Sequence, residues 1–127
     1  MIVLDASVLI AHLDERDNHH ERASRLLAET GAEPLGASTI TLAETLVAPA
    51  RAGRLEDVVA ALSRLGVTEL SLADGASGQL ARLRAETGCK LPDCCVLLAA
   101  REYGGTVASF DSALVSAANT LGLRIHQ

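Results

Sequence analysis

The segment IVLDASVLIA, residues 2–11, places an acidic residue between two short apolar runs. The first run is typical of a buried β-strand, Asp5 follows it directly, and the second run predicts a short helix. The same order returns near the other end of the chain in TVASFDSAL, residues 106–114, where Asp111 takes the place of Asp5. Strand, acid and helix therefore follow one another twice, which favours a sheet whose strands lead into helices.

Strands and helices alternate through the rest of the chain. The predicted strands span residues 1–4, 34–38, 67–72, 106–110 and 123–126, and the predicted helices span residues 8–13, 21–30, 39–52, 55–65, 74–87, 92–103 and 111–121. Pro49 should kink the third helix or end it early. This alternation predicts an α/β fold of three layers, with a central parallel sheet of about five strands. No linker divides the sequence, so we expect a single domain over residues 1–127.

Composition narrows the classes of function. The chain has 127 residues, of which 49% are hydrophobic, so it can bury a core of its own. Its formal net charge of -5 argues against a nucleic-acid binder with a basic surface. The exception is a cluster of carboxylates that binds divalent cations, because the bound ions reverse the local field. With one Phe, one Tyr and no Trp, the chain has no aromatic platform for stacking bases.

The same composition favours a cytoplasmic protein. Three cysteines, two of them adjacent, make a poor disulfide framework and suit a reducing compartment. No apolar run approaches the roughly 20 residues that span a bilayer. The first residues lack a basic leader, so we expect neither a secretory signal nor a membrane partner.

Four carboxylates are expected at the carboxyl edge of the sheet, where such folds bind ligands: Asp5, Glu44, Asp93 and Asp111. Each has a purely structural interpretation. Asp5 and Asp111 would cap helices, Asp93 would complement a helix dipole, and Glu44 would complete a capping box with Thr41. Asp74 occupies a similar position and is expected to be only a cap.

Taken together, the acids favour a metal site. Asp5, Glu44 and Asp93 are flanked by apolar residues, and a carboxylate in such a setting needs a charge partner. No Lys or Arg lies near Asp5 or Glu44 in the sequence. Hard divalent ions such as Mg²⁺ or Mn²⁺ take oxygen ligands and would relieve the repulsion among the acids.

For most of the other side chains that can bind metals or RNA, a structural interpretation is favoured over a functional one. Three histidines lie in a polar junction, where a solvated surface is favoured over a zinc site: His12, His19 and His20. Three cysteines lack the spacing and the fourth ligand of a zinc site, and at least one is expected to be buried as an apolar group: Cys89, Cys94 and Cys95. Most arginines are expected on solvated helix faces, but Arg51 and Arg54 are candidates for RNA backbone contacts.

At these acidic residues the sequence resembles PIN-domain proteins and, more narrowly, the VapC-type toxin ribonucleases of bacterial toxin-antitoxin pairs. The resemblance covers the whole chain in motif order and length. It runs through IVLDASVLIA with Asp5, TLAETL with Glu44, LPDCCVLLAA with Asp93, and TVASFDSAL with Asp111. The first and third blocks are the most specific. Ser7 matches a small hydroxyl residue of the first block.

The resemblance implies a PIN-like parallel sheet ordered 3-2-1-4-5 and an endoribonuclease that requires Mg²⁺ or Mn²⁺. It implies that the four acids bind the metal and activate water, with Ser7 and Ser109 as hydrogen-bonding supports. It also implies a homodimer, an RNA substrate such as tRNA or another structured RNA, and a cognate VapB-type antitoxin that docks over the acidic pocket.

Three alternatives remain open. The first is a non-catalytic protein- or RNA-binding module on the same α/β fold, which would bind no metal. The second is a receiver-like phosphoacceptor domain, which needs an acidic pair near the first strand and a late Lys, whereas the single Lys here is Lys90. The third is a phosphatase with an Asp nucleophile, which would have a second Asp where this chain has Ser7.

Overall fold

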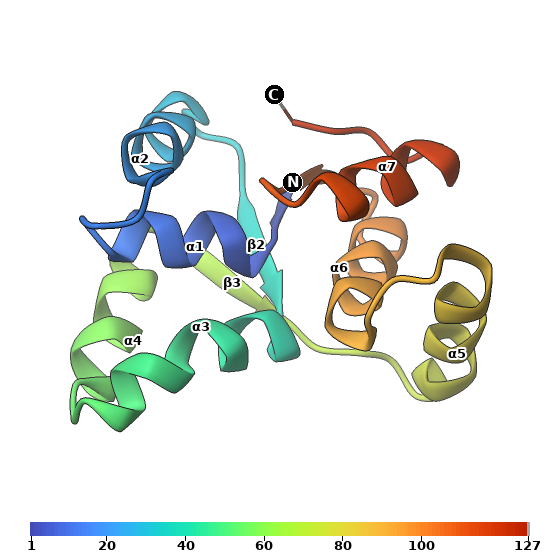
Figure 1. The fold of residues 1–127 in the computed structure, drawn as a ribbon, viewed down its shortest axis with the longest axis horizontal. Helices are drawn as coiled ribbons and strands as arrows, with labels where there is room; N and C mark the ends of the chain where they lie inside the picture. The colour runs from blue at the N-terminus through green and yellow to red at the C-terminus, as the bar shows by residue number, and fades with distance from the viewer. Residues whose placement is uncertain (127) are drawn as a thin grey trace.

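The computed structural model describes residues 1–126 and shows an α/β fold with a parallel sheet between two layers of helices (Figure 1). Its four strands lie in the order β3-β2-β1-β4 and are β1 (Ile2–Leu4), β2 (Leu35–Ser38), β3 (Val67–Leu70) and β4 (Thr106–Ala108). The helices are α1 (Ala6–Leu13), α2 (His20–Glu29), α3 (Thr39–Arg51), α4 (Leu55–Arg64), α5 (Ala76–Thr87), α6 (Leu91–Glu102) and α7 (Ser112–Thr120). None of these helices is long and apolar enough to cross a membrane.

The predicted fifth strand is wrong. Residues 123–126 form a single parallel bridge between Val107 and Ile125. Two backbone hydrogen bonds hold it, from Val107 N to Arg124 O (2.9 Å) and from His126 N to Val107 O (2.8 Å). The backbone N of Leu123 still donates to Ala118 O at the end of α7 (2.9 Å), so the segment leaves the helix too late to pair with β4 over its full length. The order of the other four strands agrees with the expected 3-2-1-4.

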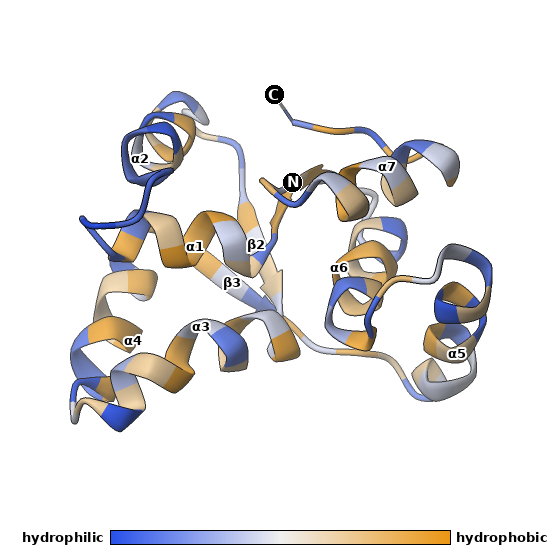
Figure 2. Ribbon diagram, viewed as in Figure 1, coloured by the Kyte–Doolittle hydropathy of each residue, from blue (hydrophilic) through white to orange (hydrophobic). Residues whose placement is uncertain are grey.

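The two faces of the sheet bury separate apolar clusters, as the alternation of side chains along a strand requires. In β1, Val3 packs with the cluster beneath α5, α6 and α7, whereas Ile2 and Leu4 pack with the cluster beneath α1, α2 and α4. Figure 1 shows α1–α4 on one side of the sheet and α5–α7 on the other. The ribbon of α6 is mostly hydrophobic in Figure 2, in agreement with seven consecutive buried residues in this helix.

The helix bounds agree with the sequence to within a few residues, with two instructive differences. The first helix begins directly after Asp5, at Ala6, so the strand passes into the helix without a loop. The third helix continues past Pro49 to Arg51, so the proline does not end it early. A proline in the last turn of a helix removes only one hydrogen bond near an end that is already incomplete.

Candidate functional site

Asp5 lies at the junction of β1 and α1 and is buried, with 6% of its surface exposed. Its Oδ2 accepts two hydrogen bonds, from Ser7 Oγ at 2.7 Å and from Ser109 Oγ at 2.8 Å. The side chain does not cap α1, so the structural interpretation of Asp5 is wrong. Oδ1 accepts no hydrogen bond from residues 1–126, and it is not sealed from solvent. One carboxylate oxygen is thus held in place and the other is free for a ligand.

The two serines also fix the loop that follows β4. The hydroxyl of Ser7 accepts a hydrogen bond from Phe110 N at 3.0 Å, and that of Ser109 accepts one from Asp111 N at 3.0 Å. Because each hydroxyl donates its single proton to Asp5, its oxygen remains available to the backbone donors. The network joins Asp5 to a residue 104 positions away in the chain. It therefore positions Asp111 relative to Asp5.

Asp111 caps α7, as its structural interpretation expects. The carboxylate Oδ1 accepts hydrogen bonds from Ala113 N at 2.9 Å and Leu114 N at 3.2 Å. The side chain is exposed, and its charge still contributes to raising the pKa of Asp93. Capping and proximity to the other acids are therefore compatible in this residue.

Glu44 extends from α3 and takes no part in a capping box. The N-cap of α3 is Ser38, whose Oγ accepts a hydrogen bond from Thr41 N at 3.1 Å. The side chain of Glu44 is exposed and makes no hydrogen bond with the described part of the chain. Partial loss of solvent raises the pKa of Glu44, and the negative charges of Asp5 and Asp93 raise it further, while Lys90 lowers it.

Asp93 lies in the first turn of α6 and is half-buried. Burial raises the pKa of Asp93 first, the charges of Asp5 and Asp111 raise it further, and Lys90 partly offsets them. The charge of Asp5 therefore acts on both Glu44 and Asp93, and the charge of Asp111 acts on Asp93, so each of the four acids has at least one of the others as an electrostatic neighbour. None of them forms an ion pair within residues 1–126.

Asp74, by contrast with the four acids above, lies outside the candidate site. The N-cap of α5 is Gly75, without a side-chain cap, so the expected capping role of Asp74 is wrong. Asp74 is exposed, and its charge is not among those that shift Glu44 or Asp93. The structure thus separates this acid from the four that converge.

The four acids match the chemistry of a hard divalent cation. They offer only oxygen donors, they repel one another, and they have no cationic ion-pair partner within residues 1–126. In the described part of the chain, however, no three His, Cys, Asp or Glu side chains form a ready-made metal cluster. Mg²⁺ in proteins is commonly held by one or two carboxylates and keeps several waters. The donors therefore fit an open magnesium-type site rather than a closed cage.

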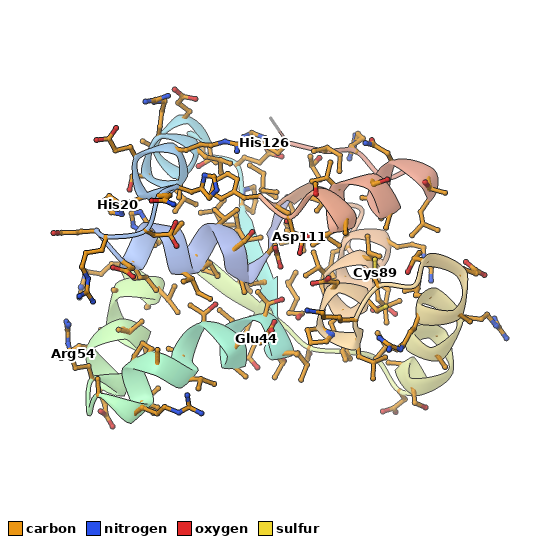
Figure 3. All side chains as sticks on the ribbon, viewed as in Figure 1. His20, Glu44, Arg54, Cys89, Asp111 and His126 are labelled. Carbon is orange, nitrogen blue, oxygen red and sulfur yellow. The ribbon has the colours of Figure 1, made fainter. Side chains whose placement is uncertain are left out.

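The structure keeps the two predicted RNA-binding arginines away from the acids. Arg51 ends α3, seven residues after Glu44, which corresponds to roughly 10 Å along a helix axis. Arg54 is exposed, and its Nε lies 4.0 Å from Oδ2 of Asp57. Figure 3 shows Arg54 at the outer end of the molecule and Glu44 near its centre. Contact of these arginines with the scissile region of an RNA is therefore not supported by their position.

The histidines and cysteines make structural contacts. His12 Nδ1 lies 3.0 Å from Ser24 Oγ, and His20 Nδ1 lies 2.8 Å from the carbonyl oxygen of Ala11. These contacts tie α1 to α2. The three cysteines are buried with free thiols: Cys89, Cys94 and Cys95. Burial raises the pKa of the Cys94 and Cys95 thiols, which makes them poor nucleophiles and metal ligands.

A second group beside the acids had no signal in the sequence. Arg22 and Arg25, on α2, line a cavity that Ser109 and Phe110 also line. The i, i+3 spacing of the arginines is ordinary for a solvated helix face. Only the fold reveals that this face of α2 adjoins the residues after β4.

Comparisons with known proteins identify the family of the chain. The sequence model of the PIN domain matches residues 2–119. No curated protein sequence matches the chain significantly. Among solved structures, VapC20 of Mycobacterium tuberculosis, described as a Sarcin-Ricin loop cleaving toxin, has a TM-score of 0.76 and 25% identity, covering 92% of this chain and 95% of that one.

Two further structures share the fold. FitAcB from Neisseria gonorrhoeae has a TM-score of 0.74 and 20% identity, covering 100% of this chain and 97% of that chain. A toxin-antitoxin complex from Klebsiella pneumoniae contains a chain with a TM-score of 0.69 and 20% identity, covering 88% of each. Together with the sequence match, which spans nearly the whole chain, they lead to one conclusion: the protein belongs to the PIN domain family.

Proposed function

We propose that this protein is a metal-dependent endoribonuclease that acts as the toxin of a toxin-antitoxin pair and thereby inhibits translation or growth. Membership of the PIN domain family supports a nuclease. The similarity to VapC20, a toxin described as cleaving the Sarcin-Ricin loop, supports RNA as the substrate. The acidic cluster supports hydrolysis that depends on Mg²⁺ or Mn²⁺.

The observation that carries the proposal is the state of Asp5. Two serine hydroxyls hold one of its oxygens at 2.7 and 2.8 Å, and its negative charge helps to raise the pKa of both Glu44 and Asp93, while Asp111 also acts on Asp93. A structural role alone would not require so many unpaired carboxylates at one edge of a sheet, because their repulsion costs stability. A bound divalent cation would relieve this repulsion and would attract an anionic substrate.

The residues divide the work according to their positions. Asp5 and Asp93 are the principal cation ligands, with Glu44 acting through water or orienting a water molecule. Asp111 adds charge at the site while it caps α7. Ser7 and Ser109 keep Asp5 in its orientation. A bound Mg²⁺ or Mn²⁺ would supply charge neutralisation at the scissile phosphate and lower the pKa of a water ligand.

The partners proposed are a VapB-type antitoxin and a second copy of the chain. Related structures include one described as a toxin-antitoxin complex. This chain also exposes apolar side chains on α3 and α4, where Val47, Leu55 and Val59 are each more than a third exposed. Between these helices and β3 lies a groove of about 430 Å³. Such a surface is typical of a protein-protein contact.

The direct test is cleavage of RNA by the purified protein. Total cellular RNA is incubated with the protein, with and without Mg²⁺ or Mn²⁺ and with excess chelator, and the products are resolved on denaturing gels. We expect cleavage only with the metal. Cleavage that persists with chelator, or none under any condition, contradicts the proposal and favours a non-catalytic binding module. Growth arrest on expression, relieved by an adjacent gene, tests the toxin role separately.

Removing either serine hydroxyl should weaken the site without unfolding it. We expect Ser7→Ala and Ser109→Ala each to lower metal affinity or cleavage by roughly 10- to 100-fold, the usual cost of losing a hydrogen bond that orients a ligand. Because both hydroxyls act on the same oxygen, the double variant should lose less than the product of the two. Exposed Ser112→Ala is the matched control. Metal titration and initial rates report the effects, and fully multiplicative losses would contradict a shared role.

Stability should respond jointly to pH and metal. The pKa values of Glu44 and Asp93 are raised in the folded state, so the folded protein holds these protons to higher pH than the unfolded chain does. Metal-free stability should therefore decline as pH rises from about 4, where ordinary carboxyls ionise, toward 7. We expect Mg²⁺ to raise Tm more at pH 7 than at pH 4.

Thermal melts of the variant Asp93→Asn isolate the contribution of the Asp93 charge to the dependence of stability on pH and metal. Without metal, its Tm should equal or exceed that of the native chain at pH 7, because one repelling charge is gone, and this difference should shrink toward pH 4. With metal at pH 7, its gain in Tm should be smaller than that of the native chain. A metal shift that is the same at both pH values, or in both proteins, would rule out the carboxylates as the binding groups.

A further inference from the structure

A small cavity lies beside the acids, between one face of α2 and the residues that follow β4. Its volume is about 120 Å³. The lining residues are Arg22, Arg25, Leu26 and Glu29 from α2, and Ser109, Phe110 and His126 from the opposite wall. The four residues of α2 recur at i, i+3, i+4 and i+7, so they share one face of that helix. This face turns two arginines toward the loop that carries Ser109.

The cavity and the acidic site share their walls. Ser109 lines the cavity and donates its hydroxyl proton to Asp5 at 2.8 Å. Phe110 also lines the cavity, and its backbone N donates to Ser7 Oγ at 3.0 Å. In Figure 3, Asp111 is drawn between His126 and Glu44. A phosphate bound at the acids through divalent ions would therefore have this cavity as its neighbour.

The charges of the cavity are available to a ligand. Within residues 1–126 neither Arg22 nor Arg25 forms an ion pair. Glu29 lies on the same wall and is not within ion-pair distance of either arginine, and two arginines against one carboxylate leave the lining with a net positive charge. The Arg22 guanidinium carbon lies 4.4 Å from the centroid of the Phe110 ring. This cation-π contact restricts the side chain at the mouth of the site.

Size and chemistry select the ligand. Cavities that enclose a drug-sized molecule measure about 300–1,000 Å³, so this one is too small for a whole nucleoside. A phosphate group is smaller, and the planar fork of an arginine matches two of its oxygens. The single phenylalanine ring is covered by Arg22, with His19 5.2 Å away, so it is not open for a base to stack on.

We propose that this cavity binds an RNA phosphate next to the scissile one, with Arg22 and Arg25 donating hydrogen bonds to its oxygens. The inference rests on the proposed function for the place of the scissile phosphate. Phe110 is a positioning residue that acts through Arg22. The site gives an acidic protein a local cationic contact for the RNA backbone, on the opposite flank from Arg51 and Arg54.

The test measures binding apart from cleavage. A fluorescent single-stranded RNA is titrated with Asp93→Asn protein in Mg²⁺, across a series of salt concentrations, with and without Arg22→Gln or Arg25→Gln. We expect each change to weaken binding about tenfold and to lower the salt slope by about 0.7 for each phosphate that the protein no longer neutralises. Arg64→Gln, at an exposed arginine near the end of α4, is the matched control and should change neither quantity.

Two further measurements distinguish the proposed roles of Arg22 and Phe110 in RNA binding from a general effect on the structure. In the otherwise native protein, Arg22→Gln should raise KM for RNA with little change in kcat. Phe110→Leu should weaken binding about threefold, and it should add nothing once Arg22→Gln is present. A Phe110→Leu loss that multiplies with that of Arg22→Gln contradicts the positioning role.

The outcomes distinguish the two proposals. If no form cleaves RNA but both arginine changes still weaken binding and flatten its salt dependence, the proposed function is wrong and the phosphate site stands. If the protein cleaves RNA while affinity, salt slope and KM are unchanged in both variants, the phosphate site is wrong. Circular dichroism and thermal melts are run on every variant, and equal losses from Arg64→Gln would also overturn the site.

Discussion

Asp5→Asn and Asp93→Asn should each abolish metal-dependent RNA cleavage, with rates lower by roughly 1,000-fold or more and the fold intact. Metal catalysis supplies several kcal/mol of transition-state stabilisation, and each 1.36 kcal/mol is a factor of ten in rate. An amide keeps the shape of the carboxylate but offers a neutral oxygen, which binds a hard cation weakly. Neither change removes apolar packing, because both side chains are polar and asparagine has nearly the size of aspartate.

Asp74→Asn is the matched control for these variants. It makes the same chemical change at an exposed acid that follows a strand, but its charge does not act on Glu44 or Asp93. Its cleavage rate should equal that of the native protein. Initial rates with Mg²⁺ and with Mn²⁺, together with circular dichroism, provide the comparison. Full activity in Asp5→Asn or Asp93→Asn would exclude the corresponding residue from the metal site.

Among the substitutions considered, Leu98→Ala should cause the largest loss of stability, about 2–5 kcal/mol in the free energy of unfolding. Leu98 lies in α6, the helix that carries Asp93, and none of its surface is exposed. Its side chain packs in the cluster between the sheet and α5–α7, where a cavity would be poorly refilled. Since small domains are stable by only about 5–15 kcal/mol, this loss is a large fraction of the total.

Leu91→Ala makes the same change on the same helix at a side chain that is 49% exposed. It should cost well under half as much, because less apolar area leaves water and no closed cavity forms. Urea denaturation reports both values, with an unchanged m-value as the check for two-state unfolding. Similar losses in the two variants would show that α6 is not anchored by its buried face. Cys95→Ala, at a buried thiol, should likewise affect stability much more than cleavage.

Local patterns were enough to predict most of the architecture. The apolar runs that end at Asp5 and Asp111 predicted two of the strands, and the apolar run after Asp93 predicted the buried helix. These signals are strong because burial on both faces of a strand, or all around a helix, leaves few polar residues. The rule that parallel strands end at one edge of the sheet predicted that Asp5 and Asp111 lie near each other, whereas Glu44 and Asp93 lie on helices that this rule does not cover.

Features that depend on neighbours distant in sequence could not be predicted in this way. The residues 123–126 have a strand-like pattern, but in the fold they meet β4 at one bridge only. Thr41 and Glu44 fit a capping box, yet Ser38 lies three residues before Thr41 and takes the cap. The cavity at Arg22 forms only because α2 lies beside residues 109–110, and no local spacing encodes that proximity.

The largely exposed connector at residues 71–75, visible in Figure 1 between β3 and α5, divides the four acids of the candidate site into two pairs. Asp5 and Glu44 precede it, and Asp93 and Asp111 follow it. A chain cut there would yield two fragments, each carrying two of the four site acids and only one end of the hydrogen bond between Ser109 and Asp5. The proposed cleavage of RNA would then require both fragments together. A split form of this protein would report on whether its halves meet inside a cell.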